Sequence, residues 1–240
     1  DSVMCQTEQD KTRFEALGAK NVTTMGNTKF DEATQVAASI DWFEELKIDR
    51  EQPVVVVGST RSELEEQWVA EAFVGNPGTT FIHAPRHPET ADRINAGATA
   101  LPGVNVGRRS LGTGGNYVIL DTFGELSKVY QIADVAIIGG GFDNLGGQNL
   151  IQPLAAGKPV LHGVNMQNFR DVAATSVSRG ASIACATSGE LTSTLASLLA
   201  DPAKRKTMGE EARKLCAENV GASERYAKVV IGATQATKSK

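Results

Sequence analysis

A run of glycines is the densest set of residues in this chain that could do chemistry. Between residues 139 and 147, five of nine residues are glycine, directly after the apolar run DVAII. Glycine permits positive φ angles and lets a ligand touch the main chain. A helix expected over residues 149–156 would point unpaired N–H groups and its positive dipole end at the same place. Gly140, Gly141 and Gly147 therefore predict an anion site, with plain turn formation as the alternative.

Arg86 and His87 are the second candidate pair for binding an anion. They follow the apolar run TTFIHAP and precede a helical segment opened by Pro88 and Glu89. An arginine guanidinium can donate two parallel hydrogen bonds to phosphate or carboxylate oxygens. The alternative is that Arg86 forms a surface ion pair and His87 caps the helix.

Two further strand ends carry polar side chains. Thr60 follows VVVVGS, and its hydroxyl either holds a ligand or caps the next helix, with capping as the favoured interpretation. Glu125 lies in the turn DTFGEL after the run YVIL. Its alternative role is that of a first-turn acid, which interacts favourably with the helix dipole.

A repeating order of strands and helices positions all of these residues. From residue 53 onward, apolar runs such as PVVVVGS alternate with segments of helical period such as SELEEQWVAEAFV. Runs that are apolar on successive residues indicate strands covered on both faces. We therefore expect an α/β fold, a Rossmann-like parallel sheet with helices on both faces, which binds ligands beyond the carboxyl ends of its strands. The dinucleotide fingerprint matches poorly, and no Walker sequence GK[ST] occurs.

The first 30 residues predict a separate unit. SVMC, TEQDKTRFEAL and NVTTM read as strand, helix and strand, which is too little to make a core alone. We interpret residues 1–30 as the tail of a preceding N-terminal domain or an interdomain α/β unit. GNTKFD at residues 26–31 then reads as a hinge before the domain of residues 31–240. Because the chain does not begin with methionine, we expect it to be a piece of a longer protein.

The bulk composition narrows the class of protein. With 240 residues, 41% hydrophobic and 22% charged, the chain is typical of globular proteins. A formal net charge of −4 and the absence of a basic stripe argue against a nucleic-acid partner. Three separated cysteines indicate small buried side chains rather than a zinc site or disulfides. We expect no membrane segment in this chain, since no apolar stretch approaches the length of a span. The cysteines are typical of a reducing compartment, which favours a cytoplasmic location.

Several segments together resemble a known family. GNTKFD, APRHPET, DTFGELSKVYQIADVAIIGGG, GGQN, QPLAAGKPVL and NFRD occur in order between residues 26 and 171. They are similar to the C-terminal half of bacterial 3-deoxy-D-manno-octulosonic acid (Kdo) transferase. The resemblance implies a GT-B architecture in which residues 31–240 are the C-terminal domain that binds the donor CMP-Kdo.

The resemblance also implies which residues surround the donor. Together with the hydroxyl of Thr60, the donor-binding residues expected are Arg86, His87, Phe123, Gly124, Glu125, Gly140, Gly141, Gly147, Gln148, Asn149 and Gln152.

Three positions depart from the family pattern. Gln148 stands where the family usually has histidine, Gln152 where it has glutamate, and Arg61 where a histidine is expected. A neutral amide at residue 152 can still bond a ribose hydroxyl, but with about half the strength of a carboxylate. These departures keep donor identity open.

The implied activity is an inverting, metal-independent transfer of Kdo from CMP-Kdo to a lipid A precursor. No cofactor or metal is implied, and no DxD pair occurs. The family places its catalytic glutamate and acceptor site in the N-terminal domain, at the cytoplasmic face of the inner membrane. We therefore expect the catalytic base outside this chain, and we expect the fragment alone to bind a nucleotide but transfer no sugar. The alternatives are a GT-B transferase or epimerase with a UDP- or GDP-sugar, and a non-catalytic nucleotide-binding or scaffold module.

Overall fold

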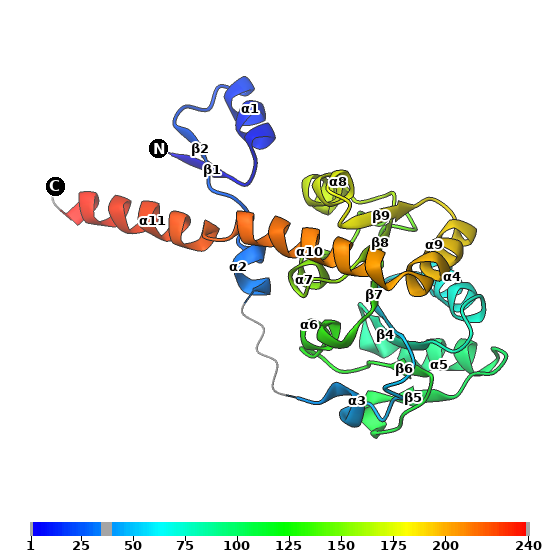
Figure 1. Cartoon of the computed structure of the whole chain (residues 1–240). Coiled ribbons are helices and arrows are strands. Elements are labelled where there is room, and N and C mark those ends of the chain that lie inside the picture. Colours follow the sequence, from blue (N-terminus) through cyan, green and yellow to red (C-terminus); the bar gives the residue numbers. More distant parts are fainter. Residues whose placement is uncertain (1, 35–39, 239–240) are drawn as a thin grey trace.

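The computed structural model describes residues 2–34 and 40–238. Its central feature is a sheet of seven parallel strands in the order β5-β6-β4-β3-β7-β8-β9 (Figure 1). This confirms the predicted fold class. The strands are β3 (Val54–Thr60), β4 (Thr80–Pro85), β5 (Val106–Arg108), β6 (Tyr117–Ile119), β7 (Val135–Ile138), β8 (Val160–Gly163) and β9 (Ser182–Cys185).

Helices cover both faces of this sheet because its strands are apolar on both. Val54 and Val56 of β3 belong to one hydrophobic cluster, whereas Val55 and Val57 belong to the other. This alternation is the two-residue period of a strand. All four valines are at most 1% exposed, which explains why the sequence shows an unbroken apolar run.

The helices divide between the two clusters, except that α10 (Pro202–Asn219) contributes Met208 to the cluster of Val55 and Val57 as well as side chains to the other. Side chains of α4 (Glu63–Val74), α5 (Ala91–Thr99) and α9 (Ser188–Ala200) pack in the cluster of Val55 and Val57. The opposite cluster receives side chains from α2 (Lys29–Ala33), α3 (Trp42–Glu45), α6 (Leu126–Val129), α7 (Ile151–Ala155), α8 (Arg170–Ser178) and α10. Short 3₁₀ turns occur at Pro88–Thr90, Arg109–Leu111, Tyr130–Ile132 and Gln167–Phe169.

The N-terminal residues form a sheet of their own. Strands β1 (Val3–Cys5) and β2 (Val22–Thr24) pair in parallel, joined by helix α1 (Glu8–Ala16), which buries no residue. Figure 1 shows this unit beside α11 (Ala222–Lys238), away from the large sheet. The boundary at residue 30 stays a prediction. Helix α2 (Lys29–Ala33) crosses it, and Phe30 of this helix is 4% exposed and packs in the core of the large sheet.

The segment expected to be a hinge is tied to the C-terminal helices. The Asp31 carboxylate accepts hydrogen bonds from the N–H groups of Gly221 and Ser223, the latter at 2.7 Å. In return, Nε of Arg225 donates to the carbonyl oxygen of Met25 at 2.8 Å. These contacts, here called the clasp, join residues 25–31 to the start of α11.

Two composition-based expectations can be compared with the described residues. Cys5, Cys185 and Cys216 are buried and free, as predicted. Within residues 2–34 and 40–238, no helix combines the length and apolarity that crossing a bilayer requires.

Candidate functional site

The candidate residues lie at the carboxyl edge of the large sheet. Strands β4, β3 and β7 are neighbours there, and they lead into the segments that carry Arg86, Thr60 and the glycine run. The main-chain N–H of Arg86 donates to the carbonyl oxygen of Thr60 at 2.9 Å. Gly139 lies against the same residue, because a Cβ built on it would be 2.6 Å from Cα of Thr60. The structure therefore brings the arginine and the glycine run to one edge, with Thr60 between them.

Arg86 presents its guanidinium to solvent. The residue is exposed, and within the described part of the chain no hydrogen bond or ion pair occupies its side chain. The alternative of a surface ion pair is therefore not what the structure has. An unpaired guanidinium at a strand end is free to bind an anion.

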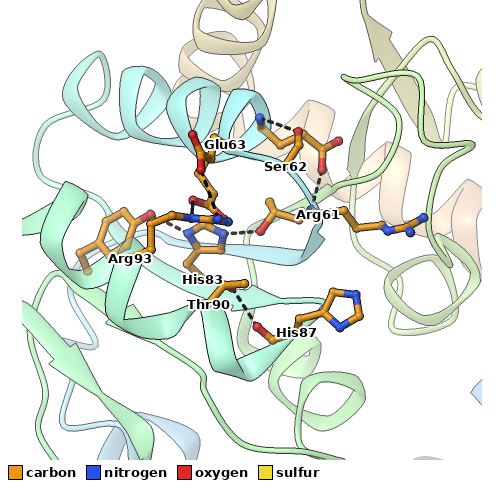
Figure 2. A network of polar contacts seen from close by, with 11 residues as sticks. Arg61, Ser62, Glu63, His83, His87, Thr90 and Arg93 are labelled. Atoms are coloured by element: carbon orange, nitrogen blue, oxygen red, sulfur yellow. Dashed lines mark hydrogen bonds and ion pairs between the residues drawn. The ribbon is translucent and has the colours of Figure 1, made fainter.

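His87 is also exposed, but it has a weak internal partner. Its Nδ1 lies 3.6 Å from the carboxylate of Glu89, and its side chain is 54% exposed. It occupies the cap position of the turn Pro88–Thr90 without a side-chain capping bond. Figure 2 shows His87 and Arg61 pointing away from the buried imidazole of His83.

Thr60 points into the protein instead of toward solvent. It is 2% exposed, and its Oγ1 lies 2.8 Å from Nε2 of His83. The cap of α4 is Ser62, whose hydroxyl accepts from the N–H of Glu65. The Thr60 hydroxyl therefore does not cap α4, which corrects the favoured interpretation, and its contact with His83 turns it away from solvent.

The turn after β6 combines an engaged acid with an exposed ring. Glu125 accepts hydrogen bonds from Nη2 of Arg109 at 3.0 Å and from the hydroxyl of Thr122. The Arg109 bond, aided by Thr122, holds the pKa of Glu125 below its usual value despite partial desolvation. Phe123 is 82% exposed, and Gly124 has a φ of +79° with open space beside it.

The glycine run is packed against its own chain. A Cβ on Gly163 would lie 2.0 Å from the carbonyl group of Gly141, and a Cβ on Gly147 would lie 2.5 Å from Sδ of Met166. The N–H of Gly147 donates to the carbonyl oxygen of Gly140 at 2.7 Å, so this amide is not free for a ligand. Close backbone packing explains much of the glycine content without a ligand.

Helix α7 differs from its prediction at its start. It begins at Ile151 rather than near residue 149, and it spans five residues. Asn149 precedes it and accepts the N–H of Ile151 with Oδ1 at 3.0 Å, so the side chain occupies one of the first free amides. Gln148 and Gln152 are half-buried beside it. The helix dipole available to an anion is correspondingly weaker than expected.

Three residues outside the expected donor-binding set organise this edge. Glu65 is fully buried and accepts N–H bonds from Arg61 at 2.9 Å and from Phe142 at 3.2 Å, so it joins the α4 turn to the glycine run. Its signal was the capping pattern Ser62-x-x-Glu65. Arg61 reaches the carbonyl oxygen of Leu145 with Nη1 at 3.4 Å, which places a second exposed cation beside the glycines. His83 gave a fainter signal, a single polar residue in an apolar strand.

A cleft of about 410 Å³ lies between the N-terminal unit, the segment 167–172 and the end of α10. None of the expected donor-binding residues is among the described residues that line it. The N–H of Asn168, one of its lining residues, donates to the carbonyl oxygen of Gly146 at 2.9 Å. The NFRD segment is therefore attached to the carboxyl edge. Among the described residues, no group of three or more His, Cys, Asp and Glu side chains is arranged to hold a metal ion.

Comparison with curated proteins finds relatives of one kind over most of the chain. A 3-deoxy-D-manno-octulosonic acid transferase of Bordetella pertussis is 35% identical over 240 residues, covering 94% of this chain and 55% of the relative. One of Chlamydophila psittaci is 29% identical over 189 residues, covering 75% of this chain and 43% of the relative. The chain thus spans about half the length of these relatives. No protein-family model matches the chain.

Comparison with solved structures agrees on the fold. The C-terminal CMP-Kdo binding domain of WaaA from Acinetobacter baumannii superposes with a TM-score of 0.64 and 22% identity. The match covers 77% of this chain and 96% of that domain.

Proposed function

Because this chain is homologous to the C-terminal part of 3-deoxy-D-manno-octulosonic acid transferases, we propose that it is the donor-binding domain of such a glycosyltransferase. Its ligand is CMP-Kdo, a sugar acid linked to a nucleoside monophosphate. The homology favours this function over a UDP- or GDP-sugar enzyme and over a scaffold module.

One observation of the structure carries the proposal: the guanidinium of Arg86, which has no partner among the described residues, at the carboxyl end of β4 beside the central strand β3. Arg61 lies on the neighbouring loop, where it contacts the glycine run. Two exposed cations at the ligand-binding edge of a parallel sheet suit the single phosphate of CMP-Kdo. The same guanidinium would stabilise the negative charge on CMP as the sugar departs.

The exposed ring of Phe123 suits the base of the nucleotide. Aromatic side chains bind nucleobases by stacking, and this ring is 82% exposed in the turn after β6. The ion pair of Glu125 with Arg109 holds this turn in place. In this arrangement Glu125 supports the site and does not itself contact the donor.

The finer features of the reaction belong to the same proposal. Transfer inverts the anomeric centre, requires no metal and delivers Kdo to a lipid A precursor at the cytoplasmic face of the inner membrane. We place the catalytic base and the acceptor site outside this chain, which spans about half the length of its relatives. We expect the 240 residues alone to transfer no Kdo, and a measurable transfer rate would contradict this placement of the base.

Titration calorimetry with CMP, UMP and GMP tests the donor. The three nucleotides have the same ribose and the same phosphate group, so a difference in affinity reports on recognition of the base. We expect CMP to bind at least about tenfold more tightly than the other two, a difference of about 1.4 kcal/mol. Preference for UMP or GMP would favour another sugar nucleotide, consistent with Gln148 and Gln152. Binding of none at millimolar concentration would refute the proposal.

A further inference from the structure

A buried histidine lies directly beneath the candidate site. His83 of β4 is fully buried, with Nε2 2.8 Å from Oγ1 of Thr60 and Nδ1 2.7 Å from the hydroxyl of Tyr117. Figure 2 shows the imidazole with a hydrogen bond on each side. Because no atom of His83 reaches solvent, it cannot contact a ligand, and any role in binding must act through its neighbours.

The neutral imidazole matches its two partners. Burial lowers the pKa of His83 to about 3, so the ring is uncharged at neutral pH. A neutral imidazole has one N–H donor and one acceptor nitrogen. Tyr117 and Thr60 each carry a hydroxyl, which can donate or accept, so both ring nitrogens are satisfied. The ring is therefore held in one orientation between β3 and β6.

The hydrogen bond to Thr60 fixes an irregular piece of backbone. Strands β3 and β4 pair in regular register up to Gly58 and Ala84, after which Thr60 pairs with Pro85. Ser59 is the extra residue of this bulge, and its φ of +62° is unusual for a residue with a side chain. A strained conformation persists only where surrounding contacts hold it. The His83 bond is such a contact, since it draws the Thr60 side chain inward.

Two parts of the candidate site depend on where Thr60 lies. Its carbonyl oxygen accepts the N–H of Arg86, which fixes the backbone from which the exposed guanidinium extends. Gly139, the first residue of the glycine run, packs directly on its Cα. A shift of Thr60 would therefore displace the arginine and the glycine run together.

We propose that His83 is a positioning residue of the donor site, which holds the Ser59 bulge through Thr60 and so sets the geometry of Arg86 and the glycine run. The inference rests on the proposed function for its ligand, but its structural part stands on the contacts alone. His83 thus affects ligand binding without contacting the ligand, because it is fully buried.

Substitutions at Thr60 isolate the hydrogen bond from the bulk of the side chain. Thr60→Val removes the hydroxyl at nearly constant volume, and Thr60→Ser keeps it. Thr80→Val is the matched control: Thr80 is also buried, at 1% exposed, and its hydroxyl bonds Gln52 at the amino end of β4. We expect Thr60→Val to raise the Kd for CMP about tenfold, whereas Thr60→Ser and Thr80→Val stay within about twofold of the wild type.

Amide hydrogen exchange without ligand gives a second readout. The N–H of Arg86 donates to Thr60, so its exchange should accelerate at least about tenfold in Thr60→Val and in His83→Leu, but not in Thr80→Val. His83→Gln, whose amide can still reach Thr60, should restore part of the protection. If His83→Leu does not fold, Thr60→Val decides. Wild-type protection of Arg86 in Thr60→Val, or equal loss in Thr80→Val, overturns the positioning role.

The two readouts separate this inference from the function on which it rests. If the wild type binds no CMP, the proposed function fails, while amide exchange still decides whether His83 positions Arg86. If CMP binds but Thr60→Val leaves its Kd unchanged, the donor site stands and His83 is only structural.

Discussion

Two neighbouring regions at the carboxyl edge of the sheet differ in what they present to a ligand. They are the glycine run at residues 139–147 and the arginine edge at residues 59–61 and 85–87. In the glycine run, the bare backbone packs inward against Gly163 and Met166. At the arginine edge, the backbone is fixed by a buried hydrogen bond, and the charged side chains of Arg61 and Arg86 extend outward.

This difference separates two reasons for placing a residue at a strand end. A glycine-rich segment suggests a ligand on the main chain, but here much of the bareness is required for contact between two loops. The chemistry available to an anion comes mainly from guanidinium groups on a rigid base. The comparison predicts that glycine substitutions act on stability, whereas arginine substitutions act on binding.

The largest effect is expected from Gly163→Ala. The added Cβ would lie 2.0 Å from the backbone of Gly141, and neither loop can move without disturbing the run. We expect a loss of about 3 kcal/mol in the free energy of unfolding, the upper end of the usual cost of overpacking, measured by urea denaturation. Gly97→Ala in α5 is the control, because a Cβ there meets no atom within 4 Å, and it should be neutral or stabilising. Equal effects would remove the packing explanation.

Arg86→Ala should reverse this pattern. Removing a charge-assisted bond to phosphate should raise the Kd for CMP about 10- to 100-fold, or about 1.5–3 kcal/mol. The free energy of unfolding should change by less than about 0.5 kcal/mol, since the side chain is exposed. Arg93→Ala, which removes a guanidinium paired with Glu66, should leave the Kd unchanged. A stability loss without a binding loss at residue 86 would end the contrast between the two regions.

Acid should lower the free energy of unfolding, because His83 beneath the arginine edge is buried in its neutral form. The pKa of His83 falls from 6.5 to about 3 on burial, so below about pH 6.5 the unfolded chain binds a proton that the folded chain refuses. Stability is therefore full above that pH and falls by about 1.4 kcal/mol per unit between about pH 5.5 and 4.5. Urea denaturation at these pH values checks the slope.

His83→Gln provides the comparison for that slope. The substitution removes the titrating ring, while His162, whose pKa is also lowered by burial, remains in both proteins. The difference between the two slopes gives the part due to His83. Identical slopes would mean that His83 does not resist protonation.

A smaller loss of stability than that of Gly163→Ala is expected at Gly124. This glycine has a φ of +79° but no atom within 4 Å of an added Cβ, so it lacks the packing constraint of Gly163. Gly124→Ala should cost only the backbone strain of about 1–2 kcal/mol, and Gly124→Asn should cost less because asparagine tolerates this conformation. Thermal unfolding measures both. A loss as large as that of Gly163→Ala would show that conformation, not packing, dominates.

The fold could be predicted from the sequence because burial on both faces leaves a simple pattern. The run from Val54 to Val57 predicts its strand without knowledge of its neighbours. The start of α7 was predicted two residues early, because the Asn149 side chain accepts the N–H of Ile151 from a position before the helix.

The orientation of side chains at the edge could not be predicted in the same way. A bulge at Ser59 shifts the register, which sends Thr60 inward against the simple alternation of the strand. The partners of His83 lie 23 and 34 residues away in sequence, and only the strand order brings them together. In the sequence Glu65 reads as an ordinary acid of the first helical turn, and its bond to the N–H of Phe142 in the glycine run depends on the tertiary fold.

The clasp between residues 25–31 and the start of α11 has a mechanical consequence. Asp31 accepts hydrogen bonds from the segment that starts α11, and Arg225 of α11 donates one to Met25, so the two segments are joined in both directions. A pull on the strand pair β1 and β2 is therefore transmitted to α11 as well as through the covalent linker. Because Asp31 belongs to α2, which packs in the core of the large sheet, the same bonds also couple α11 to the main domain.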